Sequence, residues 1–148
     1  IVDKDDAKTI EALDRNMKPS TQDVRLHREL GTSFFEHFGV AAPGWNMQAE
    51  DIKNLREAAV GKVYENDGYT STSFDKGQNV FNRPVKLNIK APKGTPMLIS
   101  PDRDFGDQIS EAEVLLARGT AMKITGVRMT TDKWGEMAVT VDCEVLLD

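Results

Sequence analysis

The chain contains 148 residues, of which 39% are hydrophobic and 29% charged, and its formal net charge at pH 7 is −5. This length and composition suit one globular domain with a single core. Scattered basic residues and the absence of a long apolar run argue against a nucleic-acid partner and against a membrane span. The single cysteine, Cys143, argues against a disulfide framework and is expected to be a small core residue. Because the first residue is Ile1, we expect residues 1–148 to form one domain of a longer or processed protein.

The first third of the sequence is predicted to be mainly helical. Apolar residues recur at helical spacing between residues 3 and 17, and Lys18-Pro19 ends this element. Residues 24–30, VRLHREL, then alternate in the manner of a strand, which places Arg28 on the same face as apolar neighbours. A charge in such surroundings needs a partner. A short helix is expected over residues 33–38 and a longer one over residues 48–60.

The remaining two thirds are predicted to be strands separated by Gly, Pro and Asp turns. The expected strands are YTSTSF, VKLNIKA, PMLIS, EAEVLLA, AMKITGVRM and EMAVTVDCEVLL. Helices followed by strands indicate the α+β class with a mostly antiparallel, sandwich-like core. The polar segment SPDRDFGDQIS, between the third and fourth of these strands, has the composition of a functional loop.

Two glutamates, Glu111 and Glu113, point the same way on the expected strand EAEVLLA, separated by roughly 7 Å of backbone rise. Alone, they are best explained as surface acids at a solvated edge, but an apolar run follows them directly. A carboxylate pair on one face serves glycosidic-bond chemistry, in which one carboxylate stabilises an oxocarbenium-like transition state and the other handles a proton. The bond between nicotinamide and ribose in NAD is of this kind. Its cleavage also requires a cation for the diphosphate and hydroxyl donors for the carboxylate.

Three segments, in order, resemble the mono-ADP-ribosyltransferases of the Arg-Ser-Glu class, which include clostridial binary toxins and vertebrate arginine-modifying ectoenzymes. The run VRLHRELG is similar to the first core strand of that family and maps its NAD-binding arginine to Arg28. The run GKVYENDGYTSTSF is similar to the Ser-Thr-Ser strand, and ISEAEVLLARGTAMKI carries the Glu-x-Glu pair. Any one motif is weak, but three in order make a strong signal. The resemblance implies an ADP-ribosyltransferase fold, with N-terminal helices packed on two mostly antiparallel β-sheets that flank an NAD cleft.

The resemblance also implies a role for each candidate residue. Arg28 would bind the NAD diphosphate or adjoining ribose oxygens. Ser71 would orient Glu113, and Glu113 would bind the ribose 2′-hydroxyl and stabilise the cation left by nicotinamide. Glu111 would activate the acceptor. In this family a glutamate there accompanies arginine as the target, because a guanidinium is almost never deprotonated unaided. A glutamine would have indicated asparagine or cysteine acceptors.

Further NAD contacts are implied beyond these. The segment DKGQNVFNRP resembles the family's nicotinamide-covering loop, in which Phe81 would stack on nicotinamide and Arg83 would contact a phosphate. Phe81 is equally compatible with a core position at the start of the next strand. The other implied NAD contacts are Glu29, Thr72 and Ser73, and the implied target-recognition loop contains Asp102, Asp104 and Phe105.

The leading prediction is an arginine-specific mono-ADP-ribosyltransferase that uses NAD as a substrate, needs no metal and acts as a monomer on a protein target. His27 and His37 lack a zinc-type arrangement of ligands, and the PDRDFGD aspartates lack the full calcium pattern. Delivery as a secreted toxin or by a phage is expected, although no signal peptide is visible within residues 1–148. Two alternatives stay open: an NAD glycohydrolase, in which water replaces the acceptor, and a catalytically silent interaction domain of a larger phage or toxin assembly.

Overall fold

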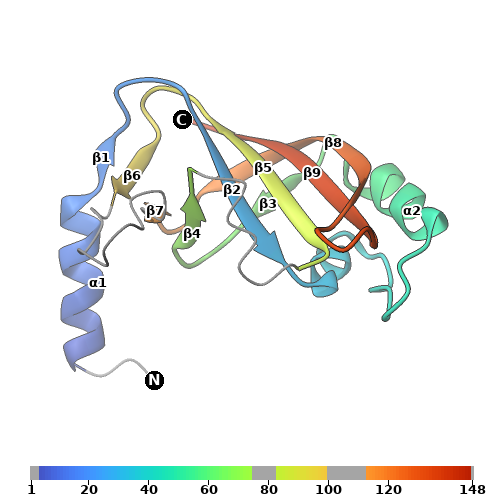
Figure 1. Ribbon diagram of the computed structural model, residues 1–148. Helices are drawn as coiled ribbons and strands as arrows, with labels where there is room; N and C mark the ends of the chain where they lie inside the picture. Colours follow the sequence, from blue (N-terminus) through green and yellow to red (C-terminus); the bar gives the residue numbers. More distant parts are fainter. Residues whose placement is uncertain (1–3, 75–82, 100–112, 148) are drawn as a thin grey trace.

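The computed structural model describes residues 4–74, 83–99 and 113–147 (Figure 1). Its helical segments are α1 (Lys4–Asn16), the 3-10 helix η1 (Thr32–Phe38) and α2 (Ala49–Ala59). Its strands are β1 (Lys18–Pro19), β2 (Val24–Leu30), β3 (Val63–Glu65), β4 (Thr70–Ser73), β5 (Val85–Ala91), β6 (Pro96–Ile99), β7 (Glu113–Leu116), β8 (Ala121–Thr131) and β9 (Met137–Val145). In Figure 1, α1 stands beside β1 and β6 at one end of the molecule, and α2 packs against β8 at the other.

The strands of the described residues form one hydrogen-bonded sheet with the strand order β1-β6-β7-β4-β2-β5-β9-β8-β3. All neighbouring pairs are antiparallel except β5 and β9, which are parallel. The predicted α+β class and mostly antiparallel pairing are therefore confirmed.

The expected pair of sheets is connected rather than separate, and β2 makes the connection. This strand pairs with β5 along its whole length, from Val24 opposite Ala91 to Leu30 opposite Val85. With β4 it shares only the pair His27 and Ser73. The strands thus fall into two groups, β1-β6-β7-β4 and β2-β5-β9-β8-β3. Because a single residue pair joins β4 to β2, the strand directions of the two groups can diverge while the sheet stays connected.

The predicted helices and strands occur close to their expected bounds, and two further strands are present. Both are short: β1 pairs with β6, and β3 pairs with β8. A two- or three-residue strand is too short for alternation to be recognised in the sequence. The helix α2 begins as its sequence suggests, because Gln48 and Asp51 form a capping box at its N-terminus.

The hydrophobic core lies on one face of β2, β5, β8 and β9 and continues onto β7 through Val114 and Leu116. Buried residues on these strands include Leu26, Ile89 and Cys143, and α2 adds Ile52, Leu55 and Ala59 from one helical face. Burial raises the pKa of the Cys143 thiol to about 12, so it stays protonated and acts as the small core residue that was expected. Within the described ranges, none of the helices has the length and apolar character required to cross a bilayer.

Candidate active site

Arg28 lies on the core-facing side of β2, where it is half-buried. Its Nη1 donates a hydrogen bond of 2.8 Å to the backbone carbonyl oxygen of Ser71 on β4. The expected partner of the Arg28 charge is therefore a main-chain oxygen of the Ser-Thr-Ser strand. Because a planar guanidinium carries five N–H donors, one bond to Ser71 leaves capacity for an anionic ligand.

Ser71 and Glu113 meet across the antiparallel pair of β4 and β7. Ser73 lies opposite Glu113, and Ser71, two residues earlier, points to the same face. The Oγ of Ser71 donates a short hydrogen bond to Oε2 of Glu113. This contact was predicted and is confirmed, whereas the catalytic roles of the two residues stay predictions.

Thr72 faces the opposite side of β4 from Ser71. It is buried, and its Oγ1 donates a 2.7 Å hydrogen bond to the carbonyl oxygen of Val114 on β7. This bond fastens the strand that carries Ser71 to the strand that carries Glu113. Ser73 pairs with β2 on one side and β7 on the other, so it stands where the two groups of strands meet.

Glu29 and Arg83 form a separate arrangement. Glu29 follows Arg28 on β2 and so points to the opposite face of the strand. Its Oε1 accepts hydrogen bonds from the backbone N–H of Arg83, at 3.0 Å, and from Nζ of Lys86, at 2.9 Å. Glu29 thus holds the segment that leads into β5, and its predicted contact with NAD stays a prediction. The Arg83 side chain is exposed.

Several predicted site residues lie outside the described residues. They are Phe81, Asp102, Asp104, Phe105 and Glu111. In the described part of the chain, no three His, Cys, Asp or Glu side chains are grouped so as to hold a metal ion.

Tyr64 on β3 is a half-buried aromatic residue that the sequence alone did not single out. Its ring packs edge-to-face against Phe34, with centroids 5.1 Å apart, and against His37, at 5.0 Å. Burial raises the pKa of Tyr64, and the nearby Arg28 guanidinium partly offsets this effect. Tyr64 therefore belongs to an aromatic group with Phe34 and His37 and is close enough to Arg28 to be affected by its charge. Its short strand gave no recognisable pattern, so only the fold places it there.

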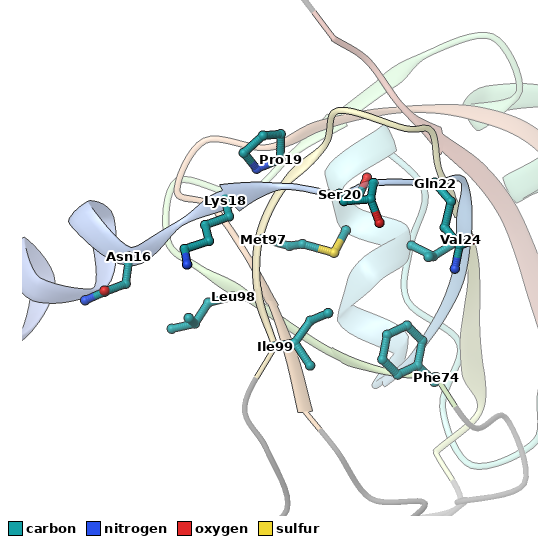
Figure 2. A pocket seen from close by; sticks show the side chains of 11 residues that line it. Asn16, Lys18, Pro19, Ser20, Gln22, Val24, Phe74, Met97, Leu98 and Ile99 are labelled. Atoms are coloured by element: carbon teal, nitrogen blue, oxygen red, sulfur yellow. The ribbon is translucent and has the colours of Figure 1, made fainter.

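An open groove of about 530 Å³ lies elsewhere, between the segment that follows α1 and the strand β6 (Figure 2). Its lining consists of Asn16, Lys18, Pro19, Ser20, Thr21, Gln22, Val24, Phe74, Met97, Leu98 and Ile99. Met97 and Ile99 pair with Leu116 and Val114, and so point to the face opposite Glu113. Arg28, Ser71 and Glu113 are not among the residues that line this groove.

Ser71 connects two groups of opposite charge. Its backbone carbonyl holds the guanidinium of Arg28, and its hydroxyl holds the carboxylate of Glu113. A cation and an anion fixed by one residue suit a ligand that has both an anionic part and a centre on which positive charge develops during reaction.

Comparisons with known proteins agree with this arrangement. A family model described as ADP-ribosyltransferase exoenzyme matches residues 1–148. The Epidermal cell differentiation inhibitor of Staphylococcus aureus is 33% identical over 82 residues, which make up 55% of this chain and 33% of that protein. The aligned part thus spans about a third of the length of this relative.

Solved structures of similar proteins cover nearly the whole chain. C3larvin toxin, an ADP-ribosyltransferase from Paenibacillus larvae, is 26% identical, with 98% of this chain and 73% of that chain covered and a TM-score of 0.76. C3stau2 from S. aureus, solved with NAD, shares the fold at 18% identity, with 99% and 73% covered and a TM-score of 0.81. The predicted family is confirmed: the chain belongs to the ADP-ribosyltransferase exoenzyme family.

Proposed function

We propose that this chain transfers ADP-ribose from NAD to an arginine side chain of a protein and releases nicotinamide. The observation that carries the proposal is the junction at Ser71, where residues from three strands meet: Arg28 from β2, Ser71 from β4 and Glu113 from β7. Membership of the exoenzyme family and the NAD-containing structure of C3stau2 support NAD as the substrate.

The chemistry assigns one task to each of these residues. The bond between the ribose C1′ and the nicotinamide nitrogen breaks, its electron pair leaves with nicotinamide, and positive charge develops on the ribose. Glu113 stabilises that charge, and Ser71 keeps the carboxylate in position. Arg28 binds the diphosphate through its remaining donors. Thr72 holds β4 to β7, so the distance between hydroxyl and carboxylate is set by strand pairing.

The assignment of the residue that activates the acceptor rests on the sequence alone. We assign Glu111, two residues before Glu113, to the removal of a proton from the attacking guanidinium, whose nitrogen then forms the new bond to C1′. The likeness to C3larvin, which is a toxin, supports a role for this chain as the enzymatic part of a toxin that acts on a protein.

Incubation with labelled NAD and agmatine, a small guanidine acceptor, tests the proposal. We expect free nicotinamide and labelled agmatine from the unmodified chain. Glu113→Gln should abolish both products. Glu111→Gln should mainly abolish labelled agmatine and spare some nicotinamide release. Glu57→Gln, which changes an exposed glutamate on α2, is the matched control and should retain both activities.

Each alternative has its own outcome in this assay. Nicotinamide without labelled agmatine or labelled protein would indicate a glycohydrolase and refute arginine transfer. The absence of both products from the folded, unmodified chain would refute the proposed activity and favour a silent interaction domain. Equal loss of both products in a folded Glu111→Gln variant would contradict the division of labour between the two glutamates.

A further inference from the structure

The helix α1 is joined to the strands by a polar group of three side chains, Asp14, Tyr69 and Arg118, here called the Asp14 cluster. The hydroxyl of Tyr69 donates to Oδ1 of Asp14 at 2.5 Å and also lies 3.1 Å from the carbonyl oxygen of Ile10. Arg118 contacts both carboxylate oxygens: Nε is 3.3 Å from Oδ1, and Nη2 forms a short ion pair with Oδ2. The guanidinium of Arg118 also lies 5.9 Å from the centroid of the Tyr69 ring.

Apolar packing contributes little to the position of α1. No residue between positions 7 and 16 is buried, and in Figure 1 the helix stands at the margin of the molecule. The helix α2, in contrast, buries Ile52, Leu55 and Ala59. Because hydrophobic burial is small, the hydrogen bonds of the Asp14 cluster have a large share in deciding where α1 sits.

The Asp14 cluster is attached to the two strands that carry the candidate active site. Tyr69 directly precedes β4 and lies two residues before Ser71. Arg118 lies two residues after Leu116, the last residue of β7, and Leu116 pairs with Thr70 at this end of the two strands. Asp14 thus accepts hydrogen bonds from residues that flank both strands, at the end opposite Glu113.

The charge state of Asp14 suits this role at neutral pH. Hydrogen bonds from Arg118 and then from Tyr69 lower the pKa of Asp14, and the hydrogen bond to Asp14 raises the pKa of Arg118. The carboxylate is therefore ionised and the guanidinium protonated. The side chains of Asp14 and Arg118 are partly exposed, so dissolved salt weakens their pairing.

We infer that Asp14 is a positioning residue for the reaction proposed above: by holding Tyr69 and Arg118 together it fixes the end of the β4–β7 pair and so aligns Ser71 with Glu113. This inference rests on the proposed function. It also implies that Asp14 affects Glu113 more than Arg28, because β2, which carries Arg28, is held along its whole length by β5 and lies outside the Asp14 cluster. A change at Asp14 should therefore reduce the rate of the chemical step and leave NAD binding almost unaltered.

The test measures kcat and KM of nicotinamide release for Asp14→Asn and Tyr69→Phe. Small displacements of catalytic groups are costly, so we expect kcat to fall roughly tenfold with KM for NAD nearly unchanged. The double variant Asp14→Arg with Arg118→Asp exchanges the two charges and should recover part of the lost kcat. Asp51→Asn is the control, since Asp51 is a hydrogen-bonded aspartate at the start of α2. It should keep the kcat of the unmodified chain.

Hydrogen–deuterium exchange of residues 7–16 and 113–118 provides a readout that does not depend on activity. Faster exchange in both segments of Asp14→Asn, together with the loss of kcat and its partial recovery in the charge-exchanged variant, supports the inference. Unchanged exchange, unchanged kcat, or a fall in kcat that only matches the loss of folded protein would overturn it. An unmodified chain that releases no nicotinamide would refute the proposed function itself, whereas an active chain with an unaffected Asp14→Asn variant refutes only the inference.

Discussion

Replacement of Ser71 by alanine separates the two contacts that this residue makes. The substitution removes the hydroxyl that donates to Glu113 but keeps the backbone carbonyl that accepts from Arg28. If the hydroxyl orients the catalytic carboxylate and Arg28 binds the diphosphate, Ser71→Ala should lower kcat for nicotinamide release and leave KM for NAD nearly constant. Few substitutions in this chain distinguish orientation of a carboxylate from binding of NAD so directly.

The size of the effect follows from the hydrogen bond that is lost. A hydrogen bond to an ionised group contributes about 1.5–3 kcal/mol. The contact between Ser71 and Glu113 is exposed, which favours the lower part of this range, about 1.5–2 kcal/mol. Since each 1.36 kcal/mol in the barrier changes the rate tenfold, kcat should fall by roughly 10- to 30-fold.

Nicotinamide release at saturating NAD measures this value, and a series of NAD concentrations gives KM. Ser20→Ala is a suitable control, because its hydroxyl also makes two hydrogen bonds, one to the carbonyl oxygen of Pro92 and one from the N–H of Gly94. This control should keep the kcat of the unmodified chain. An unchanged kcat in Ser71→Ala, or a raised KM with constant kcat, would refute the assigned role of the hydroxyl.

Three further predictions concern binding, pH dependence and stability. Arg28→Lys loses the planar fork and should weaken NAD binding, measured by calorimetry; an unchanged affinity would contradict the assignment. Burial tends to raise the pKa of Asp142, but hydrogen bonds from Arg128 and Asn88 outweigh this effect, so the pKa is lowered. The ionised carboxylate therefore stabilises the fold above the unfolded pKa of about 3.9, and this contribution is lost as the pH falls further. Denaturant midpoints from pH 7 to pH 3 should therefore show an advantage of the unmodified chain over Asp142→Asn that shrinks below about pH 4; a constant difference would refute this linkage. Replacement of the fully buried Phe35 by alanine should lower the free energy of unfolding by about 3–5 kcal/mol, measured by urea unfolding.

Much of the local structure could be predicted from residues that are near one another in the chain. Alternation in residues 24–30 placed Arg28 among apolar neighbours, and the structure shows it half-buried on β2. The spacing of Ile52, Leu55 and Ala59 predicted the buried face of α2. These patterns are reliable because the periods of a helix and a strand are properties of the backbone itself.

Glu29 has protein partners that its own strand did not predict. The family resemblance placed it among the NAD contacts next to Arg28. Alternation along β2 turns it to the opposite face, where Lys86 and the N–H of Arg83 satisfy its carboxylate. The hydrogen-bond partners of that carboxylate depend on which strand pairs with β2, and the sequence of β2 does not contain that information.

The sequence by itself determined the α+β class, the family, and the residue types that this chemistry requires. The contacts between them were decided only by the tertiary structure. Arg28 meets the carbonyl of Ser71 across 43 positions of the chain, and Ser71 meets Glu113 across 42. Both contacts, like the attachment of α1 through Asp14, depend on strand order and register. These in turn follow from the burial of the whole core, because a shift of one residue in pairing would move each side chain to the other face of its strand.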